Sequence, residues 1–216
     1  MKAFIYIGGD VDPSGLHEHP AEGDLCIAAD SGYRHARRLG ERVDLLVGDM
    51  DSLGADAPTV IAEVKAAGGE VLRVPAEKDD TDTQLAVRLA VERGADEIVI
   101  IGGLSGRLDH TLANLSVLEA LGERRILARI TDGRNRVRLL KNDSLLLANE
   151  GFRYLSLIPV DEVCRGVSIE GCRYSLSGAT LRRTNAAYST SNEIVGPAAL
   201  ISIRRGRLYV IESQER

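Results

Sequence analysis

The hydrophobic positions divide the chain into two stretches of different periodicity. In the first stretch, short apolar runs alternate with segments whose apolar residues recur every three or four positions. The runs that predict β-strands are AFIYI, LCIAA, LLVG, EVLRV and EIVII. The segments that predict helices are residues 32–39, 58–67, 82–93 and 109–121. Strands that alternate with helices predict an α/β domain with a mostly parallel sheet, and the nearly continuous runs FIYI and IVII predict strands buried on both faces.

After about residue 123 the helical spacing stops and only short strand-like runs follow, separated by Gly, Asn or Asp turns. These runs are RRILARITD, RVRLLKND, SLLLANE, RYLSLIPV, GVSIEG, ATLRR, ALISIRRG and RLYVIES. Many short strands with regular turns are typical of an antiparallel sandwich or barrel. We therefore expect an α/β domain over residues 1–124 and an all-β, sandwich-like domain over residues 125–216.

Composition narrows the possible partners. The chain has 216 residues and a net charge of −5, which argues against a nucleic-acid partner held by electrostatics. No apolar run approaches the roughly 20 residues that span a bilayer, so we expect no membrane segment. The N-terminal apolar run is too short for a signal sequence and predicts a strand. Three cysteines without a C-x-x-C pair favour a reducing, cytoplasmic location.

Glycine or aspartate follows every predicted strand of the first domain. The segments concerned are residues 8–10, 30–32, 49–51, 78–82 and 102–109. Because open α/β sheets bind ligands beyond the carboxyl ends of their strands, we expect these segments to meet at one rim. Their convergence is a stronger signal than any single motif.

Two of the aspartates at this rim, Asp49 and Asp51, are one residue apart directly after an apolar run. Side chains two positions apart in a strand share a face, where like charges repel. Either both carboxylates point into water, or a cation lies between them. With oxygen ligands and only four histidines, that cation would be magnesium rather than zinc.

Further acids surround the start of the third predicted helix. Thr81 followed by Gln84 fits a capping box with Thr81 as the N-cap. Acids near a helix N-terminus stabilise the helix dipole, which accounts for one acid better than for three. We therefore expect Asp79 and Asp82 to contact metal or substrate, while Asp80 fits either interpretation equally.

The segment GGLSGRLDH, residues 102–110, is a glycine-rich turn before a predicted helix. Such turns present backbone N–H groups to phosphate, and Arg107 is placed to clamp a phosphate oxygen. Asp109 is placed to cap the helix. The segment matches neither the Walker A loop nor the G-x-G-x-x-G dinucleotide pattern. Together with Asp49 and Asp51 it predicts a site for phosphate and magnesium.

The ordered set ADSG, GDMDSL, EKDDTDTQLA, GGLSGRLDH and STSNE resembles the thiamine pyrophosphokinase (thiamine diphosphokinase) family over nearly the whole chain. The resemblance implies an α/β catalytic domain, a β-sandwich domain and a homodimer with thiamine near the subunit interface. It also implies a transferase that uses ATP and Mg²⁺ to convert thiamine to thiamine diphosphate, with release of AMP.

The resemblance further implies roles for individual residues. The catalytic set is Asp49, Asp51, Asp79, Asp82, Arg107 and Asp109, of which the first four are expected to hold magnesium. The residues expected to contact the nucleotide are Asp30, Ser31, Gly32, Thr81, Gly103, Ser105, Gly106 and Arg107. Ser191 and Asn192 match a thiamine-binding pair. The neighbouring Tyr188 offers a ring face to the cationic thiazolium, in a chain with no Trp.

Three other functions use related features. The nearest alternative is a pyrophosphokinase acting on another small alcohol, such as 6-hydroxymethylpterin. A metal-dependent sugar-nucleotide transferase also uses an Asp-x-Asp pair, but it would not predict the KDDTD and GRLDH segments. A nucleotide sensor without turnover would not need all five matching acids. The STSNE segment in the second domain favours thiamine as the acceptor.

Overall fold

The computed structural model describes residues 1–75 and 80–215, without the side chains of residues 186–188. The chain forms two compact units, residues 1–133 and 134–216. We had expected the change between residues 124 and 125. In the part of the chain that the structure describes, no helix is long and apolar enough to cross a membrane.

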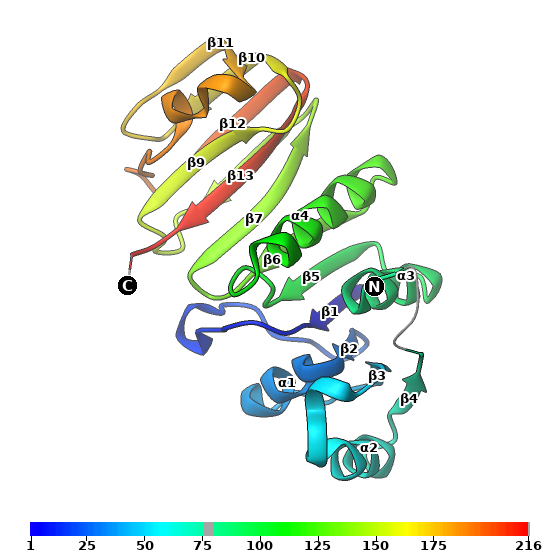
Figure 1. Ribbon diagram of the computed structural model, residues 1–216. Coiled ribbons are helices and arrows are strands. Elements are labelled where there is room, and N and C mark those ends of the chain that lie inside the picture. The colour runs from blue at the N-terminus through cyan, green and yellow to red at the C-terminus, as the bar shows by residue number, and fades with distance from the viewer. Residues whose placement is uncertain (76–79, 216) are drawn as a thin grey trace. The chain divides into compact units, whose positions relative to one another are not determined.

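The first unit contains a parallel sheet in the order β4-β3-β2-β1-β5-β6, shown in Figure 1. The five strands that we predicted are all present. The strand bounds are β1 Lys2–Tyr6, β2 Leu25–Ala29, β3 Leu45–Gly48, β4 Glu70–Arg73, β5 Glu97–Ile101 and β6 Leu127–Thr131. Four of them, β1, β2, β3 and β5, are buried over nearly their whole length, as strands covered on both faces should be.

The sixth strand explains the later boundary. The run RRILARITD was predicted to open the β domain, but β6 lies parallel to β5, with Ile98 opposite Ala128 and Ile100 opposite Ile130. A short strand-like run looks the same whether its neighbour is parallel or antiparallel. Only the pairing places it in the first unit.

Four helices cover the two faces of this sheet. Helices α1 (Tyr33–Leu39) and α2 (Ala57–Ala66) pack their apolar residues on the face that carries Phe4, Leu46 and Val99. The chain then reverses direction across the sheet. Right-handed crossovers from β4 to β5 and from β5 to β6 therefore put the next two helices on the opposite face. These are α3 (Asp82–Glu92) and α4 (Leu108–Glu123).

The strand order creates the binding position of the fold. From β1 the chain passes outward to β2, β3 and β4, and later returns to β5 on the other side of β1. The loops after β1 and β5 therefore leave the sheet in opposite directions, which opens a crevice at their carboxyl ends. The glycine-rich segments at residues 8–10 and 102–106 follow these two strands.

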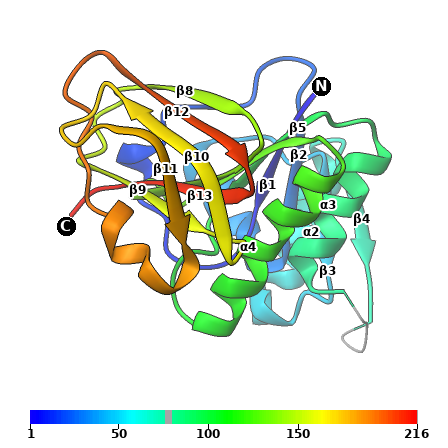
Figure 2. The ribbon, with the colours of Figure 1, turned by 90° about the horizontal axis from the view of Figure 1, so that it is seen from above.

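The second unit contains two antiparallel sheets, in the orders β7-β13-β9 and β11-β10-β12-β8, seen from two directions in Figures 1 and 2. Leu140, Leu157 and Val210 from the first sheet share a core with Val167 and Ile201 from the second. The strands are β7 Asn135–Lys141, β8 Ser144–Ala148, β9 Tyr154–Pro159, β10 Val163–Glu170, β11 Leu176–Arg182, β12 Ala198–Arg205 and β13 Arg207–Ser213. The predicted all-β sandwich is confirmed.

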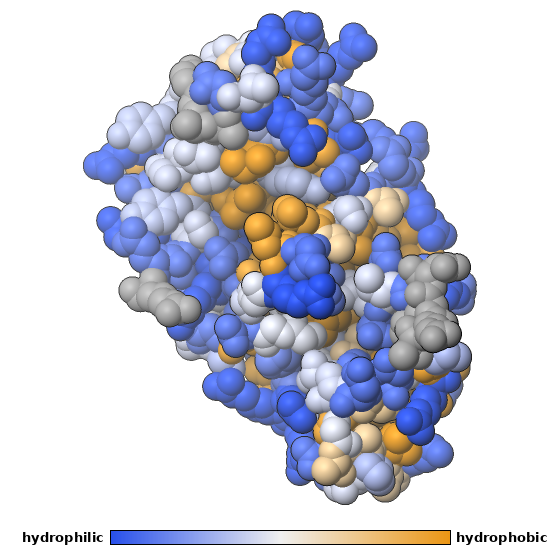
Figure 3. All heavy atoms as spheres, viewed as in Figure 1, coloured by the Kyte–Doolittle hydropathy of each residue, from blue (hydrophilic) through white to orange (hydrophobic). Residues whose placement is uncertain are grey.

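The outer face of the three-stranded sheet is partly apolar. Residues that alternate with the core positions, such as Ile158 in β9 and Ile211 in β13, are half-buried. Figure 3 shows apolar residues gathered over these strands, with hydrophilic residues around them. One helical segment interrupts the strands, η4 (Arg183–Ser189).

Candidate active site

A pocket of about 550 Å³ lies at the carboxyl end of the parallel sheet, within the first unit. Its walls come from the ends of β1, β2, β3 and β5 and from the first turns of α3 and α4. The lining residues are Ile7, Gly8, Gly9, Ala29, Asp30, Ser31, Asp49, Ser52, Asp80, Thr81, Asp82, Thr83, Gly103, Ser105, Gly106, Arg107, His110, Ala113 and Asn114. The rim predicted from the sequence is therefore one cavity.

The glycine loops after β1 and β5 touch each other across the floor of this pocket. The Gly103 N–H donates to the Gly8 carbonyl at 2.8 Å. Gly103 has φ +73, and a Cβ there would lie 2.4 Å from Ile7 Cδ1 and 2.5 Å from Asn114 Nδ2. The neighbouring Gly102 has φ +104, and a Cβ there would lie 2.6 Å from the Ile7 carbonyl oxygen and 2.9 Å from the Gly8 carbonyl oxygen. Only glycine at this position lets the two backbones approach this closely.

Three carboxylates converge beside these loops. Asp30 directly follows β2, Asp49 follows β3, and Asp51 opens the short helix η3 (Asp51–Asp56). One oxygen from each of the three lies within 4.8 Å of the others. The Asp51 N–H donates to Asp49 Oδ1 at 3.0 Å. The predicted pairing of Asp49 and Asp51 is thus joined by a third acid.

Asp30 has unusual geometry. Its φ is +51, which costs energy for a residue other than glycine. Its Oδ1 is buried and accepts no hydrogen bond in the described part of the chain. Burial raises the pKa of Asp30, a Ser52 hydrogen bond opposes the shift, and the negative charges of Asp82, Asp49 and Asp51 add to it. A buried, unpaired oxygen among clustered carboxylates fits a hard divalent cation with oxygen ligands.

The start of α3 forms the opposite wall. Thr81 is the N-cap and forms the predicted capping box with Gln84. This box places Asp82 in the first helical turn, facing the pocket. Asp80 also lines the pocket, but its carboxylate pairs with Arg88 at 3.1 Å. The predicted Asp79 lies outside the described residues.

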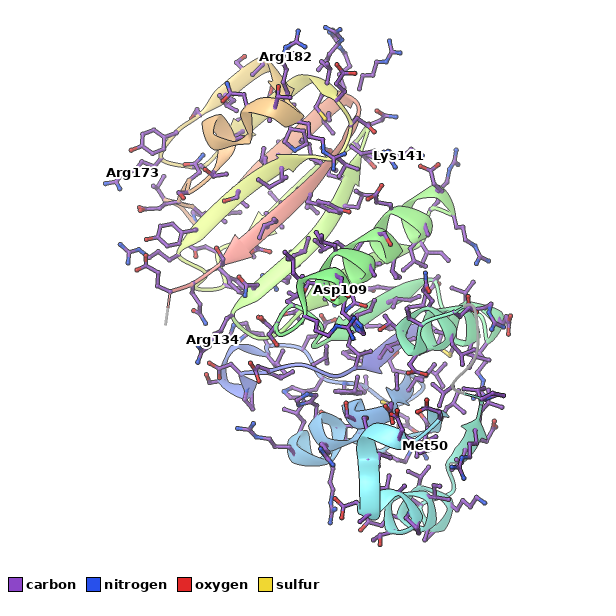
Figure 4. All side chains as sticks on the ribbon, viewed as in Figure 1. Met50, Asp109, Arg134, Lys141, Arg173 and Arg182 are labelled. Atoms are coloured by element: carbon purple, nitrogen blue, oxygen red, sulfur yellow. The ribbon has the colours of Figure 1, made fainter. Side chains whose placement is uncertain are left out.

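Arg107 and Asp109 form a pair at the mouth of the pocket, where Figure 4 shows Asp109 at the start of α4. Two guanidinium nitrogens of Arg107 donate to the two Asp109 oxygens, at 3.2 and 2.6 Å. Because of Arg107, the pKa of Asp109 falls to about 2. Asp109 does not cap the helix as we predicted, because α4 begins one residue earlier with Arg107 as its N-cap. The pair fixes the arginine next to the glycine loop.

Two further residues, Gly32 and Asn114, support the pocket, and only Gly32 was predicted from the sequence. Gly32 is buried beneath it, where a Cβ would lie 2.0 Å from the Tyr6 carbonyl oxygen. Its role here is to let α1 approach β1. Asn114 was missed, although it is buried in α4, lines the pocket and donates to the Gly103 carbonyl at 3.0 Å. The signal in the sequence was a polar residue on the buried face of a predicted helix.

In the second unit, Asn192 is only 5% exposed and its side chain is fully engaged. Its amide nitrogen donates to the Tyr174 carbonyl at 2.7 Å, and its oxygen accepts from the Tyr174 N–H at 3.0 Å. Ser191 is exposed with φ +58. Tyr174, which the sequence reasoning missed, is 64% exposed. The predicted Tyr188 side chain is outside the described part of the structure.

Two family models match the chain. Residues 17–129 match the thiamin pyrophosphokinase catalytic domain, and residues 144–208 match the thiamin pyrophosphokinase vitamin B1 binding domain. The chain belongs to the thiamin pyrophosphokinase family. The resemblance inferred from the short motifs is therefore confirmed across both units.

Individual relatives within the thiamin pyrophosphokinase family agree with this assignment. A thiamine pyrophosphokinase of Bacillus subtilis is 30% identical over 141 residues, 65% of this chain and 65% of that protein. The crystal structure of thiamine pyrophosphokinase from Bacillus subtilis superposes with a TM-score of 0.88 at 26% identity, covering 100% of both chains. The crystal structure of a thiamin pyrophosphokinase family protein from Enterococcus faecalis superposes with a TM-score of 0.85 at 29% identity, again covering 100% of both chains.

The match to the thiamin pyrophosphokinase catalytic domain contains most of the pocket, from Ala29 to Asn114. The loop at residues 8–10 lies before the matched segment. The match to the vitamin B1 binding domain contains Tyr174, Ser191 and Asn192. Each family domain thus lies within one unit of the structure.

Proposed function

We propose that this chain is a thiamine diphosphokinase, which transfers the diphosphoryl group of ATP to the hydroxyl of thiamine and releases AMP. The observation that carries the proposal is the cluster of Asp30, Asp49 and Asp51 beside two glycine loops, in a chain of the thiamin pyrophosphokinase family. A pterin alcohol as acceptor is not favoured, because residues 144–208 match a vitamin B1 binding domain.

The carboxylate cluster is the place for magnesium in this proposal. Asp49 and Asp51 keep the role predicted from sequence, and Asp30 joins them. Asp82 faces the same pocket, and Asp79 stays a prediction. When bound, the ion neutralises the triphosphate and the charge that develops on the leaving AMP. The aspartates would hold it in place, thiamine is the acceptor, and the protein supplies the geometry.

The glycine loop after β5 binds phosphate oxygens. Ser105, Gly106 and Arg107, which lead into α4, line the pocket, so a phosphate there lies near the positive end of the helix dipole and the N–H groups of the first turn. Arg107 adds a charged donor, held in place by Asp109. Ser31 and Thr81 supply hydroxyls at the nucleotide side of the same cavity.

The transfer itself is a displacement at the β-phosphorus. The thiamine hydroxyl oxygen forms a bond to that phosphorus, the bond to the oxygen bridging to the α-phosphorus breaks, and that oxygen leaves on AMP. The hydroxyl proton passes to a base, for which the carboxylates near the pocket are the available acceptors. Positioning and charge stabilisation supply most of the acceleration in such reactions.

In this proposal the second unit binds thiamine, and Ser191 and Asn192 are the predicted binding pair. Asn192 acts by fixing Tyr174, since both of its amide atoms hold the Tyr174 backbone. The exposed Tyr174 ring then replaces Tyr188 as our proposed stacking partner for the thiazolium. A cation over an aromatic face is attracted by the ring quadrupole.

The Tyr174 proposal predicts a difference between two substitutions. Tyr174→Leu should raise the KM for thiamine about tenfold, since a desolvated cation–π contact contributes about 1 to 2 kcal/mol. Tyr174→Phe keeps the ring and should stay near the wild-type KM. Steady-state kinetics with each substrate varied in turn measures both. Equal increases for thiamine and ATP, or equal effects of Leu and Phe, would contradict the stacking role.

The reaction is tested by phosphorus NMR of the protein mixed with ATP, magnesium and thiamine. Thiamine-dependent formation of AMP and a new diphosphate ester is the expected result. ADP with thiamine monophosphate would mean attack at the γ-phosphorus and a different mechanism. AMP formed with a pterin alcohol but not with thiamine would assign the chain to the alternative acceptor.

The proposal extends to the state of the protein in the cell. We propose a cytoplasmic homodimer with thiamine bound near the subunit interface, as the family resemblance implies. Three free, buried cysteines, Cys26, Cys164 and Cys172, are compatible with a reducing compartment.

A further inference from the structure

The loop at residues 8–10 lines the pocket but has no role in the function derived so far. Gly9 has φ +108, and a Cβ there would lie 3.1 Å from both Gly103 N and Ser105 Oγ. The loop therefore packs directly against the phosphate-binding segment after β5. Two side chains, His35 and Ser105, bind it from opposite sides.

Both hydrogen bonds fall on a single peptide unit, the one that joins Gly9 to Asp10. His35 Nε2 lies 2.8 Å from the Gly9 carbonyl oxygen. Since a carbonyl can only accept, His35 must carry its hydrogen on Nε2. The Asp10 N–H of the same peptide donates to Ser105 Oγ at 2.6 Å. A trans peptide directs its C=O and N–H to opposite sides, so His35 and Ser105 hold this peptide from its two sides.

The consequence concerns the Ser105 hydroxyl. Its oxygen already accepts the Asp10 N–H, so its own hydrogen remains to be donated. Ser105 lines the pocket between Gly103 and Gly106, where the phosphates of the proposed substrate lie. Hydrogen bonds in a chain polarise one another, which makes Ser105 a better donor to an anionic oxygen.

From this geometry we infer that His35 is a positioning residue for ATP, acting through the Gly9–Asp10 peptide to orient the Ser105 hydroxyl toward a phosphate oxygen. The inference rests on the proposed function for the identity of the nucleotide. His35 lies on α1, outside the pocket lining, and no motif of the sequence pointed to it. The role depends on the N–H donor at its tip rather than on its ring or charge.

Two substitutions at His35 separate the effect of the N–H donor from the effect of the volume of the side chain. His35→Leu removes the donor, and His35→Gln keeps an N–H at a similar distance from the backbone. Isothermal titration with ATP and magnesium, without thiamine, measures the dissociation constant. His35→Leu is expected to weaken ATP binding about tenfold, because a Ser105 hydroxyl that is no longer oriented loses its hydrogen bond to a charged phosphate oxygen. His35→Gln is expected to bind within about threefold of wild type.

Ser105→Ala and the double variant test the connection. If His35 acts through Ser105, the double variant should bind ATP no more weakly than Ser105→Ala alone. The KM for ATP should rise in His35→Leu more than kcat falls, with the KM for thiamine unchanged. His19→Leu is the matched control, because His19 is exposed, pairs with Glu41 and does not line the pocket. Thermal unfolding of each variant shows whether the fold is retained.

Several outcomes would overturn the inference. These are equal ATP binding by His35→Leu and His19→Leu, no recovery in His35→Gln, or losses that multiply in the double variant. A wild-type protein that binds ATP but does not modify thiamine would instead refute the proposed function and leave this inference standing. Absence of ATP binding by the wild type would refute both.

Discussion

Replacing Asp51 with asparagine is expected to lower kcat at least about a hundredfold while leaving the fold intact. The change keeps the shape of the side chain and removes one of the three charges that gather within 4.8 Å. Loss of one electrostatic contribution to a transition state commonly costs two to three orders of magnitude. Because Asp51 is exposed, its replacement leaves no buried group unpaired.

The same short helix provides the control. Asp56 ends η3, is 74% exposed and lies 3.8 Å from Arg34. Asp56→Asn removes an identical charge from the same helix at a position outside the cluster, and should retain at least about half of the wild-type kcat. Turnover of thiamine at saturating ATP and magnesium measures both variants. Near wild-type turnover by Asp51→Asn would remove Asp51 from the metal site.

Replacing Glu212 with glutamine is expected to lower the free energy of unfolding by about 3 to 5 kcal/mol. Glu212 is 1% exposed inside the second unit. It accepts two hydrogen bonds from Arg136, at 2.8 and 2.9 Å, and one from Arg138. The Arg136 guanidinium also lies over the Phe152 ring, at 4.6 Å. Glu150 also pairs with Arg136, but its side chain is 39% exposed. Removing the buried carboxylate of Glu212 therefore leaves two largely buried cations with less compensation.

Urea unfolding of the variant measures this loss. Glu215→Gln is the matched control, since Glu215 is in the same C-terminal segment and pairs with Arg153, yet both side chains are mostly exposed. An exposed pair contributes at most about 1 kcal/mol. Similar midpoints for Glu212→Gln and Glu215→Gln would show that burial of the Glu212 network does not govern stability.

The two substitutions are expected to affect different properties, turnover for Asp51 and stability for Glu212, because the two charge clusters are built differently. The Glu212 network balances its charges within the protein. The cluster of Asp30, Asp49 and Asp51 has an excess of negative charge and a buried oxygen without a hydrogen bond. Strain and unsatisfied groups of this kind concentrate at functional sites.

Much of the fold could be predicted because its signals are local. Helical spacing and apolar runs follow from how side chains alternate along an element, and they located the strands and helices of the first unit. The capping box at Thr81 depends on residues three apart, so the sequence shows it directly. The gathering of aspartate and glycine at one rim followed from a general property of parallel sheets.

The wrong predictions concern segments whose local pattern is compatible with more than one structure. Asp109 is a good N-cap by type, but Arg107 takes that position and the carboxylate binds the arginine instead. The strand at 127–131 pairs with β5 rather than opening the second unit. In both cases the sequence located the segment, but the partner of the residue or strand was not a local property.

The sequence by itself determined the order of elements, the two-part architecture and the family, because periodicity and short motifs depend only on residues close together in the chain. Tertiary structure decided which groups meet. Asp30 joins Asp49 because β2 and β3 are neighbours, Asn114 reaches the Gly103 carbonyl, and His35 reaches the Gly9 carbonyl from another helix. These contacts join residues between 11 and 26 positions apart, and distances of that kind are fixed only when the sheet and its helices pack.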